Sequence, residues 1–146
     1  MPTVAKLSIV TSMSVLCACA APESQQEKQS TGLAGTSWQL VKFVGGDDTT
    51  LVPDERSKYV MQLNADGSVT ARVDCNRGRG TWKSNAPGQI EFGPLALTRA
   101  SCPPGSLHDQ WVKQWPYVRS YVLQDGHLFL SLMADGGVYE FEPVTP

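Results

Sequence analysis

The feature that most limits how this chain can fold is a series of short runs in which every second residue is apolar. Such alternation is typical of β-strands that bury one face and expose the other. The runs start after Thr36 and are separated by turns rich in glycine, aspartate and proline. The alternating positions are Trp38, Leu40 with Val41, and Phe43; Tyr59, Met61 and Leu63; and Val69, Ala71 and Val73. We therefore expect a mainly β domain built from hairpins.

Short turn sequences mark where these strands reverse direction. The sequence Asn64-Ala-Asp-Gly67 is the clearest, because Asp-Gly readily adopts the positive φ angles of a tight hairpin. Comparable turns are found at Asn85–Gly88, Gln124–Gly126 and Ala134–Gly137. With the runs that they join, they predict about eight antiparallel strands.

One segment breaks the alternation and has helical spacing instead. Leu107, Trp111 and Trp115 are four residues apart, so they would share one face of a helix. Ser106 can cap this helix and Pro116 can end it. Tryptophans at this spacing more often join a core than form a shelf for a ligand. We expect a short helix packed on the sheet.

Composition sets the number of domains and excludes one class of partner. The chain has 146 residues, of which 41% are hydrophobic, and this suits a single globular domain. Its 12 basic and 14 acidic residues give a net charge of −2. Nucleic-acid-binding proteins normally have a strong basic excess. We therefore expect no nucleic-acid partner.

The N-terminal segment is typical of an exported protein. Lys6 precedes the mostly apolar stretch Leu7–Cys17, which is too short to span a bilayer because spanning needs roughly 20 apolar residues. The sequence Leu16-Cys-Ala-Cys19 resembles the lipobox of bacterial lipoproteins. That resemblance implies cleavage before Cys19 and its modification with diacylglyceryl and N-acyl chains such as palmitate. A soluble secreted protein cleaved nearby is the alternative.

The predicted organisation has three parts: a lipoprotein signal peptide at residues 1–18, the lipidated Cys19 with a polar tether through residue 33, and a domain at residues 34–146. The tether lacks apolar periodicity, so we expect it to be unstructured and to hold the domain about 20 Å from the membrane. Ala20, not aspartate, follows Cys19. By the sorting rule of Gram-negative lipoproteins, this indicates the outer membrane, with the domain in the periplasm.

Two further cysteines, Cys75 and Cys102, belong to the exported domain. Export favours oxidation, and a bridge would close a loop of about 27 residues, worth about 3–4 kcal/mol in the chain-entropy model. A metal site is the alternative, but neither His108 nor His127 has zinc-ligand spacing to the cysteines. We expect a disulfide, with no metal and no cofactor.

Several blocks of the domain match one known family in their order along the chain. They are Gly35–Val41, Leu63–Val69, Asp74–Gly80 followed by Trp82, Phe92–Cys102, Leu128–Leu130 and Tyr139–Phe141. Together they resemble the META domain, the HslJ-like family of bacterial envelope and heat-shock-associated proteins. The resemblance implies a small antiparallel, calycin-like β-barrel, a meander of about eight strands with one short helix packed against it. Asp74 departs from the family, which usually has glycine before the Cys-Asn pair.

Four polar residues near the cysteines are candidate binding residues: Asn76, Arg77, Arg79 and Arg99. Asparagine tolerates left-handed backbone, so Asn76 is first of all a predicted turn former, with ligand contact as the alternative. A disulfide would draw the three arginines together, and their guanidinium groups could then bind a carboxylate or phosphate. The alternative is that all three are solvated surface residues.

No catalytic motif stands out, since there is no Gly-x-Ser-x-Gly sequence and neither histidine has an evident serine or cysteine partner. We expect a monomeric, non-enzymatic envelope lipoprotein with a stress-related or protective role, acting by binding an envelope protein or a small ligand. One alternative is an inhibitor of a lysozyme or protease, with a loop presenting Arg77 or Asp74. Another is a carrier of a small hydrophobic ligand, whose interior would not be filled by Trp38, Trp82 and Phe129. A hydrolase is the weakest of these hypotheses.

Overall fold

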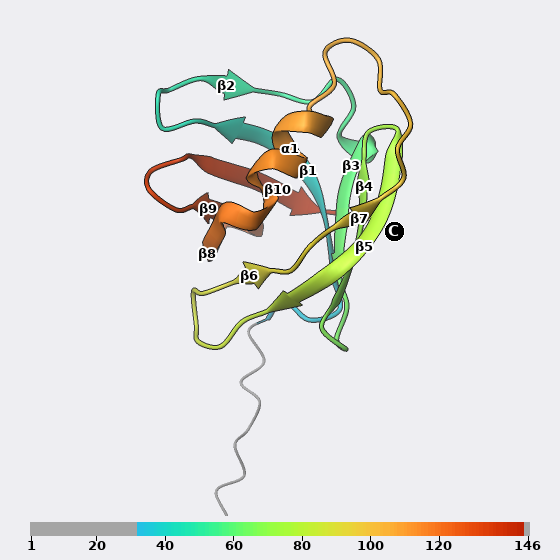
Figure 1. Ribbon diagram of the computed structural model, residues 1–146. Helices are drawn as coiled ribbons and strands as arrows, with labels where there is room; N and C mark the ends of the chain where they lie inside the picture. Colours follow the sequence, from blue (N-terminus) through green and yellow to red (C-terminus); the bar gives the residue numbers. More distant parts are fainter. Residues whose placement is uncertain (1–31, 145–146) are drawn as a thin grey trace, which may run out of the picture.

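A computed structural model describes residues 32–144, which form ten strands, one α-helix and two 3₁₀ turns (Figure 1). The predicted signal peptide, the lipidation site Cys19 and most of the predicted tether lie outside the described residues. The helix α1 spans His108–Gln114, and the 3₁₀ turns span Arg56–Lys58 and Trp115–Tyr117. The strands are β1 (Thr36–Val44), β2 (Thr50–Leu51), β3 (Tyr59–Leu63), β4 (Ser68–Val73), β5 (Asn76–Lys83), β6 (Glu91–Phe92), β7 (Ala96–Leu97), β8 (Val118–Gln124), β9 (His127–Leu132) and β10 (Val138–Pro143).

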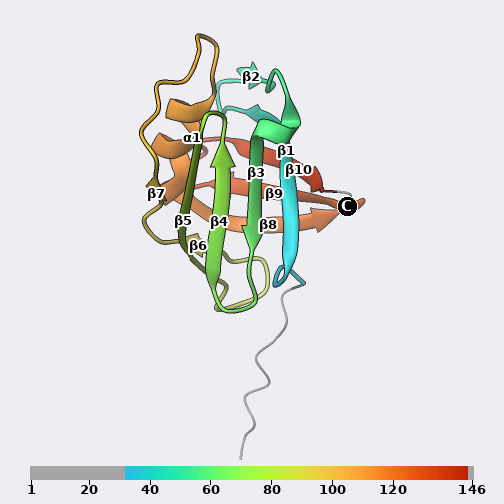
Figure 2. The same cartoon turned by 90° about the vertical axis from the view of Figure 1, so that its right-hand side faces the viewer.

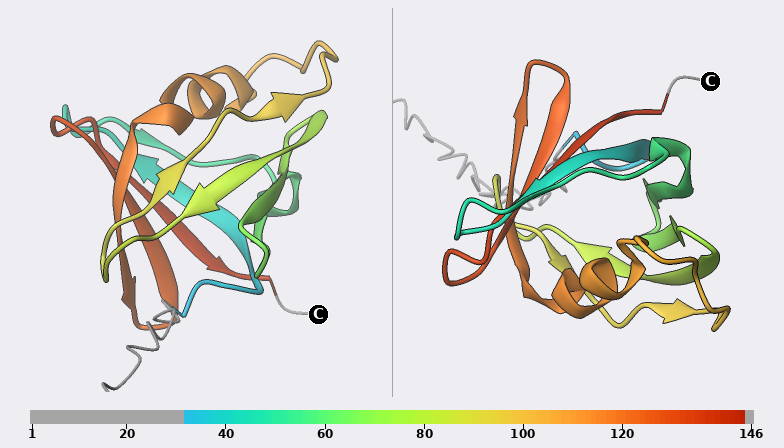
Figure 3. Two further views of the ribbon diagram at one scale, coloured as in Figure 1. Left: turned by 60° about the horizontal axis from the view of Figure 1, so that its bottom comes forward. Right: turned by 90° about the horizontal axis from the view of Figure 1, so that it is seen from above.

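The strands curl into a nearly closed antiparallel barrel, as predicted (Figures 2 and 3). Their order is β6-β5-β4-β3-β1-β10-β9-β8, while β2 pairs with β1 and β7 pairs with β5. The two terminal strands of this order, β6 and β8, are joined by hydrogen bonds just before β6. There the Ile90 N–H donates to the Arg119 carbonyl at 3.1 Å, and the Tyr121 N–H donates to the Gly88 carbonyl at 2.9 Å. These bonds satisfy part of the edge that an open sheet would leave unpaired.

Each of the four predicted hairpin turns contains at least one residue with positive φ, even though alanine, at position 134, does not favour that conformation. Asp125 and Gly126, between β8 and β9, have φ angles of 52° and 78°. Between β9 and β10, Ala134 and Asp135 have φ angles of 52° and 54°. Positive φ in both central residues matches the right-handed twist of the flanking strands.

A bulge in β1 explains the uneven spacing of its apolar residues. The register of β1 against β10 shifts between Leu40 and Lys42. Because a bulge adds one residue to a strand, it changes which later positions face inward. Leu40 and Phe43 are therefore both buried although they are three residues apart, and Val41 is half-buried.

Side chains fill the barrel interior. The alternating residues of β3 and β4 are buried as predicted, and so are Trp38 and Trp82. The prediction that Phe129 fills the interior is wrong, because β9 turns its leucines inward and leaves Phe129 on the outer side. Within the described residues, the cavity lined by residues that include Trp111 and Leu130 holds about 10 Å³. That volume is about what one water molecule needs.

The helix packs its tryptophans into the core, as predicted, although it is shorter than expected. Trp111 and Trp115 are buried, and the Trp111 ring lies 5.4 Å from the ring of Phe141. The helix begins at His108 and gives way to the 3₁₀ turn at Trp115. Ser106 accepts a hydrogen bond from the His108 N–H at 3.1 Å, but it lies before the helix start and is not its N-cap residue. No helix within residues 32–144 is long and apolar enough to cross a membrane.

Candidate functional site beside the disulfide

The hairpin between β4 and β5 positions the first residues of the site. Val73 ends β4 and pairs with Asn76, which starts β5, so the turn consists of Asp74 and Cys75. Asp74 has a left-handed φ of 55°, a conformation that glycine adopts without steric penalty. This accounts for the glycine usual at this position in the resembling family. The prediction that Asn76 is the turn former is wrong, because the positive φ falls on Asp74.

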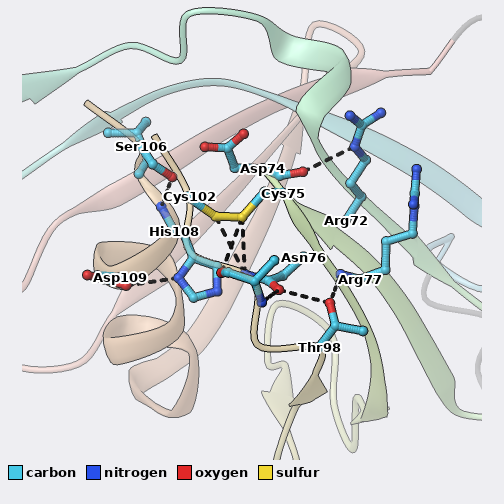
Figure 4. The surroundings of a disulfide bond; sticks show 12 residues. Arg72, Asp74, Cys75, Asn76, Arg77, Thr98, Cys102, Ser106, His108 and Asp109 are labelled. Carbon is cyan, nitrogen blue, oxygen red and sulfur yellow. Dashed lines mark hydrogen bonds and ion pairs between the residues drawn. A yellow bond between two sulfur atoms is a disulfide. The ribbon is translucent and has the colours of Figure 1, made fainter. Parts of the chain in front are cut away.

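A disulfide joins this turn to a segment far along the chain. Cys75 and Cys102 are bonded as predicted, with their Cα atoms 5.4 Å apart and a separation of 27 positions in sequence. Cys102 belongs to the segment between β7 and α1. The bond therefore fixes that segment beside the start of β5 (Figure 4).

The side chain of Asn76 reinforces the same connection. Asn76 is 1% exposed. Its Nδ2 donates to the Ala100 carbonyl at 2.9 Å, and its Oδ1 accepts bonds from the Ala100 N–H at 2.8 Å and the Thr98 hydroxyl at 2.9 Å (Figure 4). The Asn76 amide thus bonds the backbone N–H and carbonyl of Ala100 as a neighbouring strand would. Its polar atoms are satisfied within the fold, so Asn76 supports the site without offering these atoms to a ligand.

Two glycines on β5 allow the segment that contains β7 to approach closely. A Cβ atom on Gly78 would lie 2.1 Å from the Ala96 carbonyl oxygen, and one on Gly80 would lie 2.7 Å from the Pro94 carbonyl oxygen. Real Cβ atoms do not come so close to backbone oxygens. The glycines in Arg77-Gly-Arg-Gly80 are therefore needed for packing.

A cleft of about 830 Å³ lies between the segment after β7 and the helix. Its walls are residues 95–106, which include Arg99 and Ser101, together with Asn76 and three helix residues. The helix residues are His108, Asp109 and Val112. A volume of this size is within the range of small-molecule sites. Because the disulfide and Asn76 hold one wall, the cleft is formed before any ligand binds.

His108 lies at the inner side of this cleft. Its Nδ1 is 2.9 Å from Asp109 Oδ1, and 19% of its side chain is exposed. Its Nε2 is buried and has no hydrogen-bond partner among the described residues. Figure 4 shows the ring beside Asn76 and the disulfide. The exposed edge of the ring contributes to the cleft wall, whereas Nε2 does not reach solvent.

The structure separates the three candidate arginines. Arg77 and Arg79 are exposed on the outer face of β5, opposite Arg72 and Thr70 of β4. Figure 4 shows the Arg77 side chain pointing away from the disulfide. Only Arg99 lines the cleft. The predicted clustering of the three guanidinium groups beside the disulfide is therefore wrong, since alternate residues of a strand leave the fold on the same outer face.

Thr98 and His108 belong to the site, but we did not place them among the candidate binding residues. Thr98 accepts a bond from the Arg77 N–H at 3.1 Å as well as donating to Asn76. A single threonine in a loop has no periodic signal. Its position follows only once the register of β5 against β7 is known. His108 could have been placed there from its short separation from Cys102.

The cleft presents hydrogen-bonding groups and one cationic side chain, that of Arg99, rather than a set of reactive groups. The hydroxyls of Thr98 and Ser106 already form bonds within the protein. Among residues 32–144, no three His, Cys, Asp or Glu side chains lie close enough together to hold a metal ion. This arrangement suits recognition of a ligand by the exposed chain of residues 99–105 and by the Arg99 guanidinium.

Comparisons with known proteins agree with this architecture. The model of the META domain family matches residues 31–145. An NMR structure of a protein from Burkholderia xenovorans is 21% identical, with a TM-score of 0.68 over 80% of this chain and 88% of that one. A crystal structure of a DUF4847 family protein from Bacteroides vulgatus is 15% identical, with a TM-score of 0.57 over 77% of this chain and 95% of that one. Curated proteins contain no match to the sequence. At these identities the solved structures show the shared fold alone.

Proposed function

Since the chain belongs to the META domain family, we propose that it is a non-enzymatic envelope lipoprotein that acts by binding through the cleft beside its disulfide. The role of this binding is stress-related or protective. The anchor is Cys19, and the domain faces the periplasm from the outer membrane. The ligand is an envelope protein or a small molecule.

The observation that carries the proposal is that the cleft has a preformed wall. The segment from Thr98 to Cys102 is held at one end by the Asn76 amide and at the other by the disulfide. Residues held in place before binding lose less conformational entropy when a ligand arrives. Arg99, at the middle of this wall, is exposed and forms no hydrogen bond or ion pair with another residue of the 32–144 region. Its guanidinium is thus free to pair with an acidic group of the ligand.

The envelope location is supported by the disulfide and by the predicted lipidation site. The bond between Cys75 and Cys102 is of the kind that persists in oxidising compartments. The sequence Leu16-Cys-Ala-Cys19 supplies a lipidation site ahead of the domain. Two or more acyl chains give stable anchoring, because one chain binds a membrane only weakly. Labelling cells with palmitate should mark the wild-type protein and leave Cys19→Ala unlabelled.

Binding without catalysis is supported by how the polar groups of the cleft are used. A nucleophile needs a base within hydrogen-bond reach. The Nε2 of His108 is buried, and its Nδ1 faces the Asp109 carboxylate. Neither ring nitrogen is directed at a hydroxyl among the described residues. We therefore assign the ring a place in the cleft wall.

An inhibitor of a lytic enzyme is the second candidate, and the shape of the segment after β7 favours it. Residues 99–105 are almost all exposed and contain the pair Pro103-Pro104. Figure 1 shows this connection extending beyond the start of α1. A rigid exposed loop is suited to insertion into an enzyme cleft. Asp74, which we predicted as an inserting residue, is buried and unsuited to this role.

Within residues 32–144, the barrel interior lacks the enclosed cavity that the carrier hypothesis requires. A buried small hydrophobic ligand needs several hundred cubic ångströms, whereas the cavity beside the core tryptophans holds about 10 Å³.

The proposal is tested by capturing partners from envelope extract with the purified protein. The Arg99→Ala variant removes the guanidinium that lines the cleft, and Arg77→Ala is the matched control because Arg77 is exposed outside it. We expect Arg99→Ala to lose a partner that the wild type and Arg77→Ala retain. Equal capture by all three proteins would contradict binding through the cleft. Stoichiometric inhibition of a lysozyme or protease, lost in the same variant, would identify the second candidate.

A further inference from the structure

A second hollow lies at the end of the barrel where the domain begins. It holds about 440 Å³, and its walls include Gly32, Trp38, Leu123, Pro143 and Val144. Its lining residues carry no charged side chain; the remaining ones are glycine, serine and threonine. Leu123 is 43% exposed and Val144 is 36% exposed. Together with the uncharged lining, these two side chains give this end of the barrel an apolar surface suited to contact.

The hollow lies beside the point at which the chain enters the domain. Gly32 belongs to its wall, and a Cβ atom on Gly32 would lie 3.6 Å from Leu123 Cδ1. Positions 19 and 32 are thirteen residues apart (32 − 19). Even a fully extended chain of that length spans at most about 45 Å. A lipid on Cys19 would therefore keep this end of the barrel close to the bilayer.

We infer that the hollow around Leu123 rests on the surface of the lipid bilayer to which the protein is anchored. The inference rests on the proposed anchoring through Cys19. A tether makes the contact intramolecular, so a small apolar surface is sufficient for it to form. The apolar side chains would enter the boundary between headgroups and acyl chains.

The charge of this end indicates which kind of lipid surface it fits. The lining has no lysine or arginine, and Asp125 is at the tip of the adjacent hairpin. Anionic lipids attract basic segments, so this end gains nothing from them. The contact is apolar and forms on a neutral lipid surface. It also leaves the cleft beside the disulfide accessible to a partner, because the residues of the cleft and of the hollow do not overlap.

The experiment uses tryptophan fluorescence of the chain from Cys19 onward, which contains every element of the described domain. Its Cys19 thiol is coupled to a maleimide lipid in vesicles of brominated phosphatidylcholine. Cys75 and Cys102 do not react because they form the disulfide. Leu123→Trp and Val144→Trp are the probes. Val52→Trp is the control, since Val52 is 62% exposed and follows β2, which is at the opposite end in Figure 1.

We expect the bromine atoms to quench the added emission of Leu123→Trp and Val144→Trp and to leave that of Val52→Trp unchanged. Trp38 lines the hollow, but the four native tryptophans are common to all three variants, so quenching of the lipid-coupled wild type is subtracted to obtain the added emission. Quenching that is equal in all three variants, or absent from both probes, overturns the inference. Because the maleimide supplies the anchor, neither result depends on whether cells lipidate Cys19, which palmitate labelling tests separately.

Discussion

Asn76 shows how a single buried side chain can shape a binding surface. Its amide forms three hydrogen bonds with Thr98 and Ala100, and both of these residues belong to the wall of the cleft. The sequence marked this position as a candidate through its neighbour Cys75. The role itself was not predictable, because an asparagine beside a turn and an asparagine that bonds a distant segment look alike in sequence.

Replacing Asn76 with alanine should destabilise the domain. The buried Asn76 amide makes three hydrogen bonds with Thr98 and Ala100, and losing their net contribution costs about 1–3 kcal/mol in total. The free energy of unfolding, measured by urea denaturation with the disulfide intact, should fall by that amount. Asn85→Ala, in an exposed turn, is the control and should leave it unchanged. Equal stability of the two variants would show that the Asn76 bonds contribute nothing.

Glu142 gives the domain a small dependence on pH. The hydrogen bond from Arg56, and then that from Gln39, lowers the pKa of this carboxyl below its ordinary value of 4.5. A carboxyl group whose pKa is lower in the folded state stabilises the protein at pH values above its unfolded-state pKa. This stabilisation is lost as the pH falls through the folded-state pKa. Glu142→Gln should therefore cost less than about 1 kcal/mol at neutral pH. The difference from wild type in urea denaturation should vanish on acidification; a difference that persists in acid would show another cause.

Among the elements, the strands with regular alternation were predictable, and so was the short strand β6 after its turn, whereas β2 and β7 were not. β3 and β4 alternate without interruption between clear turns, so their buried residues could be read directly. β2 and β7 have two residues each and exist only because β1 and β5 offer them an edge. The helix was found from its tryptophans, although its start depended on backbone geometry near His108.

The contact between β5 and β7 should depend on the absence of a side chain at Gly78. In Gly78→Ala the new methyl group would meet the Ala96 carbonyl, 2.1 Å away. Crowding of this kind costs about 1–3 kcal/mol. Thermal unfolding should report the loss, while Arg79→Ala on the outer face of the same strand should unfold like wild type. A Gly78→Ala protein as stable as wild type would mean that β7 can move away freely.

The whole domain combines a filled barrel with a binding surface outside it. The mainly β class and the barrel were predictable because the hydrophobic period and the turns agreed along the chain. The cleft was not, since it arises where the β4–β5 hairpin, residues 95–106 and α1 meet. Sequence indicated only that Cys75 and Cys102 would join two of these segments.

Reducing the disulfide should weaken the domain and open the cleft. The chain-entropy model gives a loss of about 3–4 kcal/mol for a loop of this length. Urea denaturation of the Cys75→Ser, Cys102→Ser double variant should show this loss. Hydrogen exchange should rise most in residues 98–106, because the disulfide and the Asn76 bonds both act there. Uniform exchange across the domain would contradict a local role in holding the cleft wall.

The most direct test of binding through the cleft is photocrosslinking in living cells. A photoreactive amino acid replaces Ser101, which is exposed and lines the cleft, or Thr81, which is exposed on the outer face of β5. Mass spectrometry then identifies adducts of either a protein or a small molecule. Binding through the cleft predicts a specific adduct from position 101 and none from position 81. The same adducts from both positions, or a specific adduct from position 81 alone, would contradict it.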